Sequence, residues 1–193
     1  YREGLIIGSA CEAGELYQAL LRDAPDEEIN RIASFYDYLE IQPIANNLFM
    51  LDSDRYTPDT EEDLRNLNRR IVSIGEALQK PVVAPCDVHF LNPEDEIYRR
   101  MIFFGNKYDD ADRQPPLYFR TTDEMLREFA YLGAEKCEEV VIKNTQKIAR
   151  MVERISPVRP DKCPPVIEHS DEKLKELCYG MAHAQYGDPL PAL

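Results

Sequence analysis

Residues 82–90, with the sequence Val-Val-Ala-Pro-Cys-Asp-Val-His-Phe, decide how the rest of the chain is interpreted. They begin as a short apolar run typical of a buried strand and end with Asp87 and His89, two residues apart. In an extended chain, residues i and i+2 point to the same side. We therefore expect both side chains to project from the carboxyl end of a strand, as a carboxylate and an imidazole do when they bind one metal ion.

Two further strands are expected upstream, at residues 5–8 and 38–43, with helical patterns between the strands. The first helical run is expected at residues 16–21, and a second stretch has its apolar residues at helical spacing: Ile29, Ile32, Ala33 and Tyr36. A third helix is expected to begin at Thr57-Pro58 and has the clearest apolar stripe of the chain: Leu64, Leu67, Ile71, Ile74 and Leu78. This order predicts an α/β fold with parallel strands and crossover helices.

Each expected strand end has a side chain that could serve a metal site. Ser9 and Glu12 have capping-box spacing, which places Cys11 in the first turn of a helix, where free N–H groups favour a thiolate. The alternative is a small buried residue in a tight turn. Glu40 and Gln42 share one face of their strand, which looks either into a polar site or toward solvent. Active sites of parallel α/β folds gather at the carboxyl ends of strands, so these side chains are expected to converge with Asp87 and His89.

The second half of the chain is predicted to be helical. We expect a helix near residues 97–102 and one that begins with the Thr121/Glu124 capping box and stops at Gly133. A helix at residues 137–142 and another capped by Asn144 should come next. Residues 156–166 contain four prolines and are interpreted as an extended linker before a last helix at residues 171–186. The expected division is residues 1–155 and residues 156–193.

Composition restricts the class of protein. The 193 residues are 44% apolar and 31% charged, which suits a globular domain with a core. The formal charge of −13 argues against a direct grip on a nucleic-acid backbone. Five cysteines without a CxxC pattern suggest reduced thiols in a cytoplasmic protein, and no membrane span or signal peptide is expected. The start at Tyr1 without Met suggests a piece of a longer protein.

Several common motifs are absent, and the other histidines and cysteines indicate no site. There is no P-loop, dinucleotide glycine fingerprint, HExxH or GxSxG. His169 and His183 are expected to be solvated, and Cys86 is expected to face away from Asp87 and His89. The remaining cysteines are interpreted as structural or incidental: Cys137, Cys163 and Cys178.

Five blocks carry a family resemblance. Residues 8–15 (Gly-Ser-Ala-Cys-Glu-Ala-Gly-Glu), 35–43 (Phe-Tyr-Asp-Tyr-Leu-Glu-Ile-Gln-Pro) and 82–90 resemble successive blocks of PHP (polymerase and histidinol phosphatase) domains. Residues 115–125 (Pro-Pro-Leu-Tyr-Phe-Arg-Thr-Thr-Asp-Glu-Met) and 186–191 (Tyr-Gly-Asp-Pro-Leu-Pro) are similar to later segments of PolC-type replicative polymerases of Gram-positive bacteria. The resemblance covers essentially the whole chain in the family's order.

The resemblance implies a fold and a site. It implies the C-terminal part of a distorted seven-stranded (β/α) barrel in residues 1–155, then a linker and the first helix leading into the polymerase region. In this family a proofreading exonuclease interrupts the barrel, and the opening His-x-His ligands precede the interruption, so they would lie outside this chain. The later metal ligands map onto Cys11, Asp87 and His89, and Glu40 onto a residue at the rim of the site.

The implied activity belongs to a parent DNA-directed DNA polymerase. Other parts of that protein would bind Mg²⁺, DNA and nucleotides and would contact the sliding clamp and other replisome subunits. Zinc or manganese would bind the PHP site. This chain alone would be inactive. Two alternatives stay open: a metal-free scaffold within the polymerase, and a stand-alone PHP phosphoesterase. The chain has Pro85-Cys86 where the family usually has Thr-Gly, which predicts backbone strain at Cys86 and an altered metal site.

Overall fold

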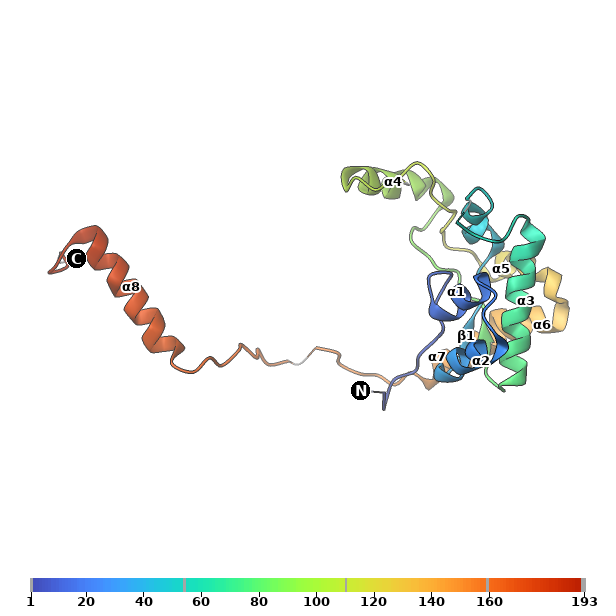
Figure 1. Cartoon of the computed structure of the whole chain (residues 1–193), viewed down its shortest axis with the longest axis horizontal. Coiled ribbons are helices and arrows are strands. Elements are labelled where there is room, and N and C mark those ends of the chain that lie inside the picture. Colours follow the sequence, from blue (N-terminus) through green and yellow to red (C-terminus); the bar gives the residue numbers. More distant parts are fainter. Residues whose placement is uncertain (1, 54, 110, 159, 192–193) are drawn as a thin grey trace. The chain divides into compact units, whose positions relative to one another are not determined.

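The computed structural model describes residues 2–53, 55–109, 111–158 and 160–191. Its Cα positions divide the chain into two units, residues 1–153 and 154–193 (Figure 1). The division falls two residues before the boundary expected from the proline-rich stretch.

Parallel pairing organises the first unit. Strands β1 (Leu39–Glu40) and β2 (Val82–Val83) pair in parallel, with Leu39 opposite Val82 and Glu40 opposite Val83. A parallel bridge from Gly8 to Tyr38 adds the first expected segment on the other side of β1, and a second bridge joins Phe90 to Tyr118. The expected parallel α/β arrangement is present, but the strands are much shorter than predicted.

A closed barrel is not formed by the described residues. Their only sheet has two strands, extended by isolated bridges, and it is open. The observed architecture is a helix-rich α/β unit around a small parallel sheet, which is compatible with a part of a barrel.

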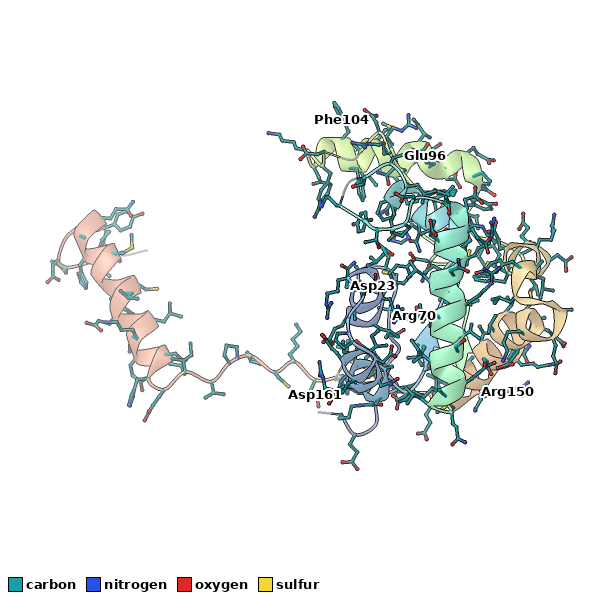
Figure 2. All side chains as sticks on the ribbon, turned by 45° about the vertical axis from the view of Figure 1, so that its right-hand side comes forward. Asp23, Arg70, Glu96, Phe104, Arg150 and Asp161 are labelled. Carbon is teal, nitrogen blue, oxygen red and sulfur yellow. The ribbon has the colours of Figure 1, made fainter. Side chains whose placement is uncertain are left out.

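Three helices form the crossovers. Helices α1 (Glu15–Leu21) and α2 (Asp26–Phe35) pack on each other between the Gly8 bridge and β1, and α3 (Glu61–Ala77) connects β1 to β2 and contacts both. The predicted stripe of α3 is confirmed, since its residues are buried or packed against the core. Its start is not at Thr57-Pro58: Thr60 accepts from the Asp63 amide in a capping box, because this pair satisfies two free amides of the first turn. Arg70 of α3 lies 3.5 Å from the Asp23 carboxylate after α1 (Figure 2).

The outer edge of β2 is covered by a helix rather than by a strand. Helix α6 (Ala134–Glu138) continues through a π-helical turn (Glu139–Lys143) into α7 (Asn144–Met151). The Ala84 amide donates to the Val140 carbonyl at 3.0 Å, and Asn144 Nδ2 donates to the Val82 carbonyl at 2.8 Å. Asn144 is therefore inside a continuous helical run and caps β2, so its predicted role as a helix cap is wrong.

Shorter elements connect these layers. They are the 3₁₀ turns η1 (Ile44–Met50), η2 (Pro93–Asp95) and η3 (Ala130–Leu132), and the helices α4 (Glu96–Gly105) and α5 (Thr122–Glu128). The Thr121/Glu124 capping box of α5 is confirmed, and Gly133 at φ +85° ends η3. Helix α4 has no buried residue.

The second unit contains α8 (Ser170–Tyr186) and the residues on either side of it. Among described residues 154–158 and 160–169 there is no helix or strand, and α8 ends at Gly187 as predicted. Among the described residues, no helix is both long and apolar enough to cross a membrane.

Candidate functional site

Asp87 and His89 lie together, but not because they alternate along a strand. Strand β2 ends at Val83, and Asp87 has a left-handed backbone with φ +54°. For a residue other than glycine, this conformation costs of order 1–3 kcal/mol and persists only where neighbouring contacts hold it. The resulting turn brings His89 Nδ1 to 3.8 Å from Asp87 Oδ1 and to 3.0 Å from the Asp87 carbonyl oxygen. If Nδ1 donates to that carbonyl, Nε2 keeps its lone pair, which is the tautomer of a metal-bound histidine.

Cys11 sits in the turn before α1 and not in the helix. The N-cap is Gly14, whose amide donates to the Cys11 carbonyl at 2.9 Å. Ser9 does not cap the helix, because its Oγ accepts from the Glu40 amide at 2.9 Å. Burial raises the pKa of the Cys11 thiol, a hydrogen bond from the Ala13 backbone partly opposes this, and the neighbouring Glu12 and Asp87 carboxylates raise it further. The expectation that Cys11 lies in the first turn of a helix is therefore wrong, and the net direction of its pKa is upward.

Glu40 lies on β1 at the same end of the sheet. Burial raises its pKa, a hydrogen bond from the Tyr38 hydroxyl partly opposes this, and the charge of Asp87 raises it further. Asp87 thus acts electrostatically on both Cys11 and Glu40. The structure brings Cys11, Glu40, Asp87 and His89 to one end of the parallel segments, where the sequence places them.

Gln42 separates from this group. Its side chain is buried and accepts from Asn46 Nδ2 at 3.3 Å. Gln42 therefore lies in a polar network and does not face solvent, while Glu40 is half-buried.

The donor types suit zinc or manganese, since a thiol, carboxylates and an imidazole are all present. The number within reach of one ion is too small: among the described residues, no group of three or more His, Cys, Asp or Glu side chains could hold a metal. The described residues of this chain therefore do not complete a metal centre.

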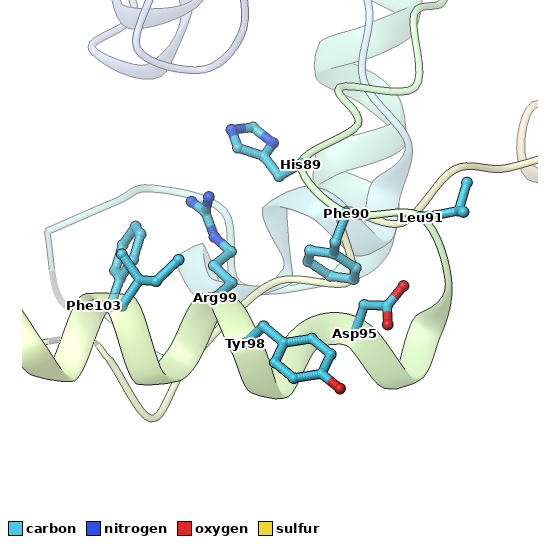
Figure 3. A pocket seen from close by; sticks show the side chains of 8 residues that line it. His89, Phe90, Leu91, Asp95, Tyr98, Arg99 and Phe103 are labelled. Carbon is cyan, nitrogen blue, oxygen red and sulfur yellow. The ribbon is translucent and has the colours of Figure 1, made fainter.

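A cavity of about 270 Å³ opens beside His89 (Figure 3). It lies between residues 89–91 and helix α4, and Arg99 faces it from the helix with its guanidinium 4.3 Å from the Phe103 ring centroid. Its other lining residues are mainly apolar or aromatic: Phe90, Leu91, Tyr98 and Ile102, with Asp95 at one end.

A buried polar network lies behind the Asp87 turn, and sequence reasoning did not foresee it. Its centre is Arg120, which is 4% exposed, and it includes Asn46 and Cys86. Cys86 is outside the positive-φ region, so the predicted strain at this residue is wrong and falls on Asp87 instead. The thiol of Cys86 donates to the Tyr118 carbonyl at 3.2 Å. The sequence contains no signal for Arg120 beyond its place before the Thr121 cap.

The two remaining histidines lie in the second unit. His169 precedes α8 and is largely exposed, and His183 lies on α8 with a side chain that is 41% exposed.

No family model matches the chain. Curated relatives named "DNA polymerase III PolC-type" match it from end to end. The relative from Clostridium perfringens (strain 13 / Type A) is 56% identical over 191 residues, which are 99% of this chain and 13% of the relative. Those from Caldanaerobacter subterraneus subsp. tengcongensis and Bacillus subtilis (strain 168) are 51% and 44% identical over 192 and 198 residues. These two matches cover 100% of this chain and 14% and 13% of the relatives.

The chain thus spans about one seventh of the length of the relatives it matches. At this identity and coverage, the chain is related over its whole length to one portion of the PolC-type DNA polymerase III family.

Proposed function

We propose that this chain is a working part of a PolC-type replicative DNA polymerase. The observation that carries this proposal is the end-to-end match at 56% identity to the Clostridium perfringens relative. The reaction would be template-directed nucleotidyl transfer in the cytoplasm, assisted by Mg²⁺ ions held by carboxylates outside this chain. DNA, nucleotides, the sliding clamp and other replisome subunits would be engaged by the rest of the protein, in agreement with the charge of −13 here.

A segment exchange tests this proposal. The matching segment of the Bacillus subtilis relative, which is 44% identical, is replaced by this chain, and the purified chimaera is assayed for primer extension. We expect DNA synthesis close to that of the parent, whereas a control protein lacking the segment should lose it. A chimaera that folds like its parent and extends no primer would overturn the proposal.

Within that protein, we propose that residues 1–155 form part of a PHP-type (β/α) barrel. The parallel segments at Gly8, β1 and β2, with crossover helices between them, support this role. Cys11, Asp87 and His89 would contribute donors for zinc or manganese, and Glu40 would line the rim. The remaining donors would come from the part of the barrel outside this chain, since the described residues offer no group of three.

The chain by itself is therefore expected to be catalytically inactive. The measurement is hydrolysis of a phosphomonoester and of single-stranded DNA by the purified chain with added Mn²⁺. Activity above background that disappears in a His89→Ala variant would contradict this proposal.

A second candidate is a metal-free scaffold that braces the polymerase. It is favoured by the small donor set and by the Pro85-Cys86 sequence, whose thiol is engaged by Tyr118 and Arg120. Metal analysis of the chimaera separates the two candidates. Stoichiometric zinc or manganese that is lost on Asp87→Asn rejects the scaffold, and a metal-free, active chimaera supports it.

A further inference from the structure

Arg120 is buried in a way that requires specific partners. Its side chain is only 1% exposed, and buried charges persist in proteins where they are paired or hydrogen-bonded. Nη1 donates to Asn46 Oδ1 at 3.3 Å and approaches Cys86 Sγ at 3.7 Å. The guanidinium lies 4.6 Å from the Tyr118 ring centroid. Nε is 4.0 Å from Glu128 Oε1, which is a charge contact and too long for a hydrogen bond.

The partners of Arg120 come from separate parts of the chain and converge on Cys86, the residue that directly precedes Asp87. Asn46 Nδ2 donates to the Cys86 carbonyl at 3.4 Å, while its Oδ1 accepts from Arg120. The Cys86 thiol donates to the Tyr118 carbonyl at 3.2 Å and accepts from the Arg120 amide at 3.4 Å. Both the carbonyl and the side chain of Cys86 are therefore fixed. The Arg120 side chain contacts Asn46, which holds the carbonyl, and Cys86 Sγ itself.

The next residue, Asp87, has the left-handed backbone, with φ +54°. Such a conformation in a residue other than glycine persists where the surroundings over-determine it. On its far side, the turn is held by the His89 amide, which donates to the Leu117 carbonyl at 2.8 Å. Residues 117–120 thus hold the turn at both ends, directly at His89 and through Cys86.

We propose that Arg120 is a positioning residue that, through Cys86 and Asn46, holds the turn in which Asp87 and His89 lie side by side. The inference rests on the proposed role of Asp87 and His89 as donors. Loss of the buried guanidinium should release Cys86, allow Asp87 to return to a negative φ and separate its carboxylate from the His89 ring.

The test uses NMR of the metal-free 193-residue chain. The readouts are the backbone shifts and the strong intraresidue amide–Hα NOE that mark a positive φ at Asp87, and the NOE between Asp87 Hβ and the His89 ring. Arg120→Met should lose these signals. A core variant of similar instability, Ile71→Ala, should retain them, because Ile71 is 1% exposed in α3 and lies outside the network. Retention of the signals in folded Arg120→Met would overturn the proposal.

A second pair of variants decides the question if Arg120→Met does not fold. Cys86→Ser keeps one donor and one acceptor at nearly the same place, whereas Cys86→Ala removes both. We expect the Asp87 signals to persist in the serine variant and to be lost in the alanine variant. Equal behaviour of the two would overturn the proposal. Because no metal is present, these results do not depend on whether the proposed metal site exists.

Discussion

Gly8 allows the Tyr38 ring to lie against the backbone of the first parallel segment, where the Tyr38 hydroxyl reaches Glu40. A Cβ added at Gly8 would lie 2.6 Å from Tyr38 Oη and closer still to two ring carbons. Real Cβ atoms do not make such contacts, so the ring would have to move away. The Gly8→Ala substitution should therefore expel Tyr38 and break its hydrogen bond to Glu40.

The expected size comes from two opposing effects. Overpacking costs about 1–3 kcal/mol. Gly8 does not have a positive φ, so alanine also brings a gain of about 0.4–1 kcal/mol by restricting the unfolded chain. The central values give a net loss of about 1.3 kcal/mol in the free energy of unfolding. In a Tyr38→Ala background the clash is absent, so Gly8→Ala should instead stabilise by about 0.7 kcal/mol.

Urea denaturation followed by far-UV circular dichroism measures all four proteins of this cycle. The coupling between the two positions should be about 2 kcal/mol. Tyr38→Phe is the matched control, because it keeps the ring and removes only the hydroxyl, so Gly8→Ala should be as costly there as in the native chain. Equal effects of Gly8→Ala in the native and Tyr38→Ala backgrounds, within about 0.5 kcal/mol, would refute the reasoning.

Local contacts elsewhere in the chain support further predictions. Gly75→Ala in α3 should destabilise by about 1–3 kcal/mol before an offset of about 1 kcal/mol from helix propensity, because the new Cβ would clash with β2. A Cβ added at Gly180 in α8 would have no neighbour within 4 Å, so Gly180→Ala should raise the helix content seen by circular dichroism. A loss of stability in both Gly75→Ala and Gly180→Ala would contradict the steric argument. Asp37→Asn should lower the free energy of unfolding at pH 7, because hydrogen bonds from the Ile7 amide and from Arg2 hold the pKa of the Asp37 carboxyl below its usual value of 3.8. That stabilisation is present above the pKa of the unfolded state and is lost as the pH falls through the pKa of the folded state. The urea midpoints of the native chain and Asp37→Asn should therefore converge in acid, and a difference that stays constant with pH would contradict this. Thr121→Ala should cost about 1 kcal/mol through its capping box, as judged from the same midpoints, and an unchanged midpoint would rule this out.

The parts of the fold that local pattern controls were predictable. The stripe of α3, the buried face of α2 and the capping box at Thr121 depend on side chains a few residues apart, and all three are present. The parallel order was also predictable from the alternation of strands and helices. Ser9 and Asn144 were assigned wrongly because each has a long-range partner: the Glu40 amide and the Val82 carbonyl take the side chains that a local cap would use.

The gathering of the candidate residues was predictable, but the geometry that brings it about was not, and their role as a site stays a prediction. The sequence predicts that Cys11, Glu40, Asp87 and His89 lie toward one end of the parallel segments, although Asp87 and His89 lie in a turn beyond β2. The left-handed turn at Asp87 was not predictable, because the contacts that hold it come from residues far away in the sequence, namely Asn46 and the segment 117–120. Burial of an arginine depends on partners from several segments, and no spacing in the sequence reveals it.

Because a helical segment covers the outer edge of β2, one of the two edges of the small sheet is blocked. The Val82 carbonyl and the Ala84 amide are already engaged by Asn144 and Val140, so another strand cannot pair with β2 at these groups. On the opposite side, no described segment pairs with the far edge of residues 5–8. Any strand that completes this sheet must therefore be added next to residues 5–8, and until it is added this edge is the place where two copies of the chain could pair wrongly.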